Sequence, residues 1–112
     1  MIEETNNKVT KNEASSSKKK SISLFDLESS KYKIIAPIDV KIEIDKTEIS
    51  GSVQKLGLYA FGETESEVIS EIQEDIIDLF EELSELSSAQ LGLKPRNWKD
   101  FLTRHIELVN GD

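Results

Sequence analysis

The chain has 112 residues and no cysteine, and its 22 acidic residues outnumber its 14 basic residues, for a formal net charge of −8. A chain of this length forms one small domain, which leaves little room for a large multi-substrate active site. The lack of cysteine excludes a disulfide framework, a thiolate nucleophile and a cysteine-based zinc site.

The sequence has no segment typical of a membrane or secreted protein. No apolar run approaches the roughly 18–20 residues that a membrane-spanning helix needs. The N-terminus, MIEETNNKVTKNE, has acids and asparagines where a signal peptide has an apolar core. We therefore expect a cytoplasmic protein that does not bind membranes.

Residues 1–30 differ in composition from the rest of the chain. They are rich in serine, asparagine and lysine, and their five acids balance five bases, so the whole acidic excess lies in residues 31–112. Such a polar segment predicts a disordered or weakly ordered tail. Its apolar residues could still make ordered contacts, as a short strand, a helical turn or a docked peptide; they are Ile22, Leu24, Phe25 and Leu27. The lysines at 18–20 are too weak a basic patch to predict nucleic-acid binding.

Three strands are expected next. Residues 38–45 alternate between apolar and charged side chains, which predicts a half-buried antiparallel strand. Pro37 has no backbone N–H and should lie at a strand start or a sheet edge. A second strand should carry Ile49, Gly51 and Val53 on one face, and a third should span residues 56–61. Gly51 and Gly57 are expected to mark bulges or bends.

A long amphipathic helix should follow the strands. Thr64 and Glu67 form a T-x-x-E capping box, which predicts the helix start. Apolar residues then recur at threes and fours, so one stripe of the helix must be buried. The stripe comprises Val68, Ile69, Ile72, Ile76, Leu79, Phe80, Leu83 and Leu86.

A shorter second helix is predicted after a loop, with Pro95 near its first turn, where the missing N–H costs little. Its buried side should comprise Trp98, Phe101, Leu102, His105, Ile106 and Val109. The predicted fold class is therefore α+β: a three-stranded antiparallel meander, a long helix, a shorter helix and an N-terminal tail.

The long helix has nine acids between Glu65 and Glu85 and no base. Such a face can simply be solvated. However, like charges four residues apart repel each other, and acids near the C-terminal end oppose the helix dipole. A basic protein partner would relieve both penalties. The candidate partner-binding acids are Glu67, Glu71, Glu74, Asp78 and Glu81.

Two further residues are candidates for a second contact surface. Ile77 lies outside the main stripe, on an uncharged strip of the helix with Ser70, Gln73 and Ser84. The second helix, which carries Trp98, could pack on this strip, or the strip could form a homodimer seam.

No catalytic, cofactor or metal site is predicted. His105 is the only histidine and lies on the apolar side of the second helix, so a packed or partly exposed side chain explains it. Asp39, Glu43 and Asp45 share one strand face and could imitate the metal site of a nuclease. Alternation on a solvated strand explains them more simply.

Several short motifs carry a resemblance to a known family. They are Tyr32 and Pro37-Ile38 at the first strand, Leu56-Gly57-Leu58 leading into Phe61-Gly62-Glu63-Thr64, the helix through Leu83, and Leu91-Gly92-Leu93-Lys94-Pro95 before Trp98. In this combination the chain resembles the HicB-like antitoxin family, specifically its short members without a DNA-binding domain. The resemblance covers about residues 31–107 and implies that residues 31–108 form a HicB-like α+β domain.

The resemblance implies a partial ribonuclease-H-like fold without nuclease activity, and a role in neutralising a small basic toxin ribonuclease of the HicA type. The sequence departs from the pattern in its second strand, EISGSVQ, and at Lys55, where a proline is expected. Residues 94–108 predict one helix, so autonomous operator binding is not expected. The alternatives are a structural or adaptor protein, which could be a homodimer, and, least favoured, a metal-dependent nuclease.

Overall fold

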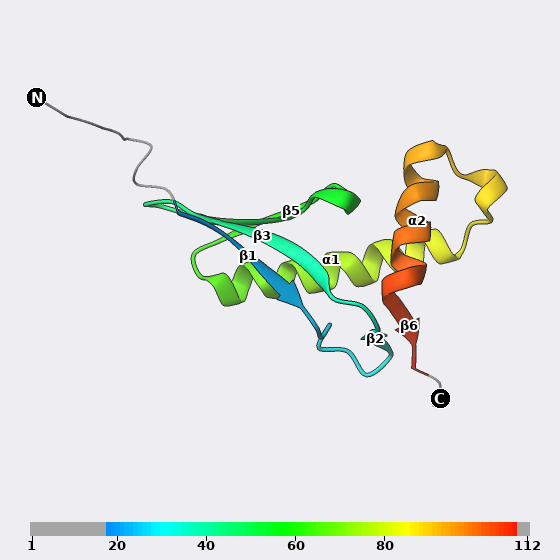
Figure 1. The fold of residues 1–112 in the computed structure, drawn as a ribbon, viewed down its shortest axis with the longest axis horizontal. Coiled ribbons are helices and arrows are strands. Elements are labelled where there is room, and N and C mark those ends of the chain that lie inside the picture. Colours follow the sequence, from blue (N-terminus) through cyan, green and yellow to red (C-terminus); the bar gives the residue numbers. More distant parts are fainter. Residues whose placement is uncertain (1–17, 110–112) are drawn as a thin grey trace, which may run out of the picture.

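A computed structural model describes residues 18–109 of the chain. The strands are β1 (Lys18–Leu24), β2 (Tyr32–Ile34), β3 (Ile38–Ile44), β4 (Ile49–Val53), β5 (Leu58–Gly62) and β6 (Ile106–Leu108). The helices are α1 (Glu65–Ser84) and α2 (Leu93–His105), with short 3-10 turns at Gln54–Leu56 and Ser88–Gln90. Figure 1 shows α1 running beneath the sheet, with α2 beside its C-terminal half. The α+β fold class is confirmed.

The main sheet has four antiparallel strands in the order β1-β3-β4-β5. The predicted meander is present as β3, β4 and β5, and Pro37 directly precedes β3. Alternation in β3 also holds, because Ile38, Val40 and Ile42 are buried while the charged residues between them are exposed. The sheet therefore has one apolar face and one face open to solvent.

The predicted boundary of the N-terminal tail, residue 30, is wrong. Residues 18–24 form β1, which pairs with β3 in a continuous register from Lys18 opposite Ile44 to Leu24 opposite Ile38. Leu24 and Leu27 are buried in the core. Of the alternatives for this segment, the structure has the short strand. The backbone edge of β3 that does not face β4 can pair with a short segment that looks polar when it is considered alone. Residues 1–17 lie outside the described part of the chain.

The start of α1 agrees with the predicted cap. The Thr64 hydroxyl accepts a hydrogen bond of 3.1 Å from the Glu67 N–H, and α1 begins at Glu65. The carboxylate of Glu67, however, accepts from the N–H of Glu63, one residue before the cap, at 2.9 Å. The side chain of Glu67 therefore has a role inside the fold.

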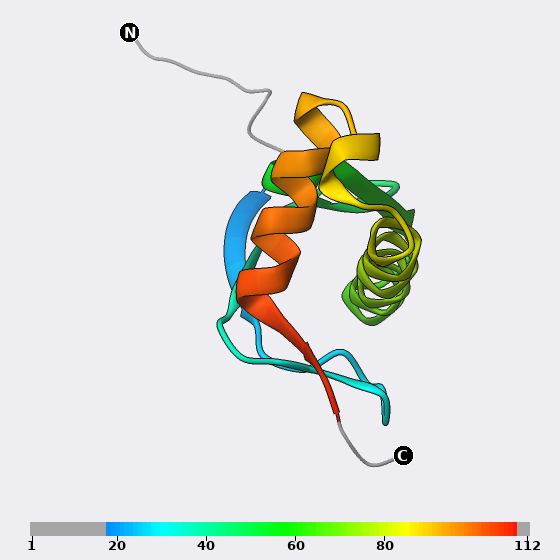
Figure 2. The same cartoon turned by 90° about the vertical axis from the view of Figure 1, so that its right-hand side faces the viewer.

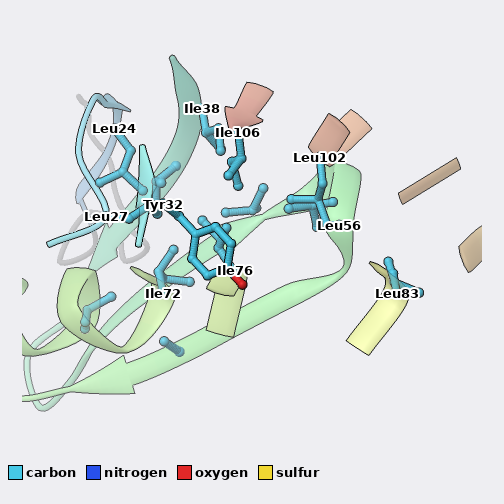
Figure 3. Packing of buried hydrophobic residues seen from close by; sticks show 14 of the residues in the cluster. Leu24, Leu27, Tyr32, Ile38, Leu56, Ile72, Ile76, Leu83, Leu102 and Ile106 are labelled. Atoms are coloured by element: carbon cyan, nitrogen blue, oxygen red, sulfur yellow. The ribbon is translucent and has the colours of Figure 1, made fainter. Parts of the chain in front are cut away.

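The core lies between the apolar face of the sheet and α1. Val68, Ile72 and Ile76 are fully buried there. Figure 3 shows Tyr32 reaching from β2 toward Ile72 and Ile76, and Leu102 meeting Leu56 at the α2 end of the cluster. Tyr32 of β2 and Leu102 of α2 are far apart in the sequence, and both belong to the core between the sheet and α1.

The two glycines of the meander have different roles. Gly57 has φ of +66°, in the left-handed region, and ends the 3-10 turn that leads into β5. Gly51 is not a bulge, because it pairs regularly with Ile42 and Ala60. A Cβ at Gly51 would lie 2.6 Å from Cγ1 of Val68, so the missing side chain allows α1 to approach the sheet closely.

The second helix is shorter than predicted. It ends at His105, and Ile106–Leu108 form β6, which pairs antiparallel with β2. Leu102 and Ile106 are buried as expected, whereas Val109 is 40% exposed. The backbone carbonyl of His105 accepts a hydrogen bond of 2.8 Å from the Ile35 N–H, which helps to replace the helix with a strand. No helix within residues 18–109 is both long and apolar enough to cross a membrane.

Candidate functional site

The outer face of α1 is an acidic surface. Glu71, Glu74 and Asp78 are exposed there, as predicted, and so are Glu82 and Glu85. None of these five side chains forms an ion pair with a basic residue of the described chain. We call Glu71, Glu74, Asp75, Asp78 and Glu82 the acidic flank.

The negative charges of the acidic flank act on the carboxyl group of Asp75. Burial is the main cause that raises the pKa of the Asp75 carboxyl above its ordinary value of 3.8. The negative charges of Glu71, Asp78 and Glu74 raise this pKa further. A positive charge placed beside the flank would have the opposite effect and would lower this pKa.

Glu67 and Glu81, two of the predicted partner-binding acids, are occupied within the chain. Glu67 accepts from the backbone at the helix start. The Glu81 carboxylate accepts hydrogen bonds from the Tyr32 hydroxyl at 2.8 Å and from Lys31 Nζ at 3.4 Å. The Tyr32 hydrogen bond is the main cause that lowers the pKa of Glu81 below its ordinary value of 4.5. We therefore exclude both side chains from the free acidic surface.

At Gln73, the uncharged strip of α1 contacts a different segment from the one expected, while Ser70 and Ser84 are exposed. Gln73 is buried and its side-chain amide donates a hydrogen bond of 2.9 Å to the carbonyl of Asp26, in the segment between β1 and β2. Ile77 is half-buried and packs against the core cluster. A homodimer contact on this strip stays a prediction, but Gln73 in the strip is buried within the chain.

Trp98, a residue of α2, packs beside Gly57 in the turn before β5. It is half-buried against the core, and its Cζ2 atom lies 3.6 Å from the position that a Cβ at Gly57 would take. Its indole therefore covers the turn before β5, which is a structural role. Trp98 belongs to α2, whereas the exposed acids belong to α1.

The open face of the sheet carries the residues that the sequence reasoning overlooked. Its registers form two rows of neighbouring side chains across the four strands. These rows are Ser21–Lys41–Ser52–Tyr59 and Lys19–Glu43–Ser50–Phe61. The two aromatic side chains stand at the β5 end of the rows and are 63% and 58% exposed.

Two hollows lie over this open face. One of about 330 Å³ lies beside Phe101 and His105, and one of about 620 Å³ is lined by Tyr59 and Phe61. They share Ser21, Lys41, Ser52 and Gln54. The small serine side chains in the middle of the sheet leave this space between the larger residues at its margins.

The other chemical candidates have structural explanations. The ring of His105 stacks on Phe101 with a centroid distance of 3.9 Å, and its Nδ1 lies 2.7 Å from the Phe101 carbonyl oxygen. Asp39 and Glu43 lie on the open sheet face, and no group of three acidic, histidine or cysteine side chains in residues 18–109 could hold a metal ion.

No family model, curated protein or solved structure matches this chain.

The alternation of side chains along β5 signals the exposed aromatic pair in the sequence. In the strand LYAFG, Ala60 faces the core, so its neighbours Tyr59 and Phe61 must face the opposite side. Large aromatic side chains on a solvated face are a signal of binding, because burying them on a partner is favourable.

Proposed function

We propose that this chain is a non-enzymatic protein-binding module that captures a small basic protein, as an antitoxin-like neutraliser of a HicA-type toxin ribonuclease. The observation that carries the proposal is the exposed acidic surface of α1. It comprises Glu71, Glu74, Asp78, Glu82 and Glu85, and none of these side chains forms an ion pair with a basic residue within residues 18–109. A basic protein would supply the missing counter-charges and would be steered to this face by its field.

The fold supports a binding role through the way it uses its acids. Glu67 and Glu81 are held by internal hydrogen bonds, while Glu71, Glu74 and Asp78 point into solvent. The acids are concentrated on one helix although each raises the repulsion on its neighbours. That arrangement raises the free energy of the free domain and lowers that of its complex with a cationic partner.

The specific partner class comes from the resemblance to HicB-like antitoxins alone. A HicA-type toxin is small and basic, which agrees with the charge of the acidic face. Such a partner would be neutralised by having its RNA-binding surface covered, so no catalytic residue is required of this chain.

The test is co-purification of the tagged chain with a HicA-type toxin, and with the product of any adjacent gene for a short basic protein, at low and high salt. The test variant replaces Glu71, Glu74 and Asp78 with lysine. Glu81 is left intact because its bond to Tyr32 belongs to the fold. A matched control replaces Asp39, Glu48 and Asp100 with lysine, three exposed acids outside α1 that give the same change in net charge.

The α1 variant should lose most of the captured partner at low salt, while the control variant keeps it. Both variants should unfold at nearly the parent's urea midpoint. Equal capture by the parent and the α1 variant at both salt levels would show that the acidic face is only solvated surface. Failure of every basic candidate to bind would favour the structural or adaptor alternative.

A further inference from the structure

Strand β5 is an unprotected edge of the sheet. It is the last strand in the order β1-β3-β4-β5, so one row of its backbone N–H and C=O groups pairs with no other strand in the described chain. Its sequence, LYAFG, contains no charged residue and no proline. The opposite edge strand, β1, begins with three lysines, a common protection against strand addition. Lysines therefore protect the β1 edge against strand addition, whereas no charged residue protects the β5 edge.

The two faces of the β5 edge have different chemistry. On the open face, Tyr59 and Phe61 present exposed aromatic rings beside the larger hollow. On the other face, Ala60 is buried against α1 and adds little bulk. A strand added to β5 would place alternate side chains beside the aromatic pair and the remaining ones above α1.

The acidic flank lies on the β5 side of α1. Gln73, Phe80 and Glu81 contact the segment that follows β1, through Asp26, Tyr32 and Lys31. Helical periodicity puts Glu71, Asp75 and Asp78 on the other side of the helix. In Figure 2, where α1 is seen nearly end-on, the cyan segment that follows β1 passes below α1 and the green strands of the sheet lie above it.

We propose that the β5 edge accepts an extended segment of the partner protein as a fifth strand, with basic side chains alternating with apolar ones. The apolar side chains would pack on Tyr59 and Phe61, and the basic ones would reach the acidic flank. Main-chain hydrogen bonds to β5 would supply affinity, and the alternation would supply specificity. The proposal rests on the proposed function and adds to it the binding mode and the partner motif.

A second copy of this chain fits the edge less well. Antiparallel pairing of two β5 strands would place two α1 helices side by side beneath one continuous sheet. Their acidic flanks would then face each other, and like charges in contact oppose association. Charge complementarity therefore selects a basic partner segment.

The test uses three short fluorescein-labelled peptides and the full chain. In the first peptide lysine alternates with valine and phenylalanine. The second has the same composition with the lysines grouped at one end, and the third is the first with alternate backbone N–H groups methylated on the edge that would face β5. Binding is measured by fluorescence anisotropy, and the contacted residues are mapped by amide chemical shifts.

The alternating peptide should bind most tightly, and methylation should weaken it by about tenfold or more, since it removes several main-chain hydrogen bonds. Amide shifts should change in Leu58–Gly62 and in the acidic flank, but not in β1. Replacing Tyr59 and Phe61 with serine should weaken binding by about tenfold, because two cross-strand contacts are lost. Phe25→Ser, at another exposed aromatic residue, is the matched control and should change nothing.

The other outcomes separate this proposal from the proposed function. Equal binding of the alternating and grouped peptides, with shifts confined to α1, would retain capture by the acidic face and overturn strand addition. No binding of any peptide would also overturn strand addition, whereas co-purification judges the proposed function independently. A dimer in sedimentation velocity that the Tyr59 and Phe61 replacements dissociate would make the occupant a second copy and overturn the basic segment.

Discussion

The Tyr32 hydroxyl donates a hydrogen bond of 2.8 Å to Oε2 of Glu81, a residue 49 positions away in the sequence. The ring of Tyr32 also packs edge-on against Phe80, with a centroid distance of 5.4 Å. Together these contacts fix the segment between β1 and β3 against α1. Glu81 therefore stabilises the fold, while the exposed acids beside it on α1 stay available to a partner.

Tyr32→Phe should destabilise the domain in a pH-dependent way. The pKa of Glu81 is lowered in the folded state, chiefly by the Tyr32 hydroxyl. A lowered pKa contributes stability above the ordinary value of 4.5, and this contribution is lost as the pH falls through the lower folded value. The gap in urea midpoint between parent and variant should therefore be largest near neutral pH and should shrink in acid.

Tyr59→Phe is the control for that experiment, because its hydroxyl lies on an exposed side chain of the open sheet face. It should leave the midpoint unchanged at every pH. A gap for Tyr32→Phe that stays constant from pH 7 to below the lowered pKa of folded Glu81 would show that the lost bond does not depend on the charge of Glu81.

Gly51→Ala should destabilise the domain by about 1–3 kcal/mol, because the new methyl group overlaps Cγ1 of Val68 and forces α1 away from the sheet. Gly92→Ala is the matched control, since its Cβ would lie 4.0 Å from Cδ of Pro95, which is an ordinary van der Waals contact. Chemical denaturation followed by circular dichroism measures both. A parent-like midpoint for Gly51→Ala would mean that α1 can shift without loss of packing.

Asp75→Asn should stabilise the domain at neutral pH. Burial and three neighbouring acids raise the pKa of Asp75, so the folded state holds its proton more tightly than the unfolded chain does. A raised pKa gives stability that is present below the ordinary value of 3.8 and is lost as the pH rises through the folded value. The asparagine variant avoids that loss, so its advantage in thermal midpoint should appear above this range and vanish in acid. Asp100→Asn, an exposed residue of α2, should give no such pattern.

Leu24→Ala should destabilise the domain by about 2–5 kcal/mol, because Leu24 is a core residue contributed by β1. Its neighbour Phe25 is 69% exposed, so Phe25→Ala should have little effect. Urea midpoints of the two variants give the comparison. Similar small effects at both positions would show that residues 18–30 belong to the tail and that the sheet has three strands.

Local patterns predicted most of the elements correctly. The alternation in β3, the Thr64 cap and the apolar stripe of α1 depend on neighbours within a few residues, so they can be read directly. Pairing between distant segments cannot be read in this way. Residues 18–24 and 106–108 became strands because β3 and β2 offered edges to pair with, and neither segment alone shows which strand it pairs with.

The candidate site divides in the same way. The sequence by itself determined that α1 carries a dense acidic face, because charge and helical period are local properties. Only the tertiary structure decided which acids are free, since Glu81 is held by Tyr32 and Glu67 by the backbone of Glu63. It also decided that Tyr59 and Phe61 stand on an open sheet face at an unpaired edge. Strand order and long-range hydrogen bonds depend on how the chain closes on itself, and no single segment encodes that closure.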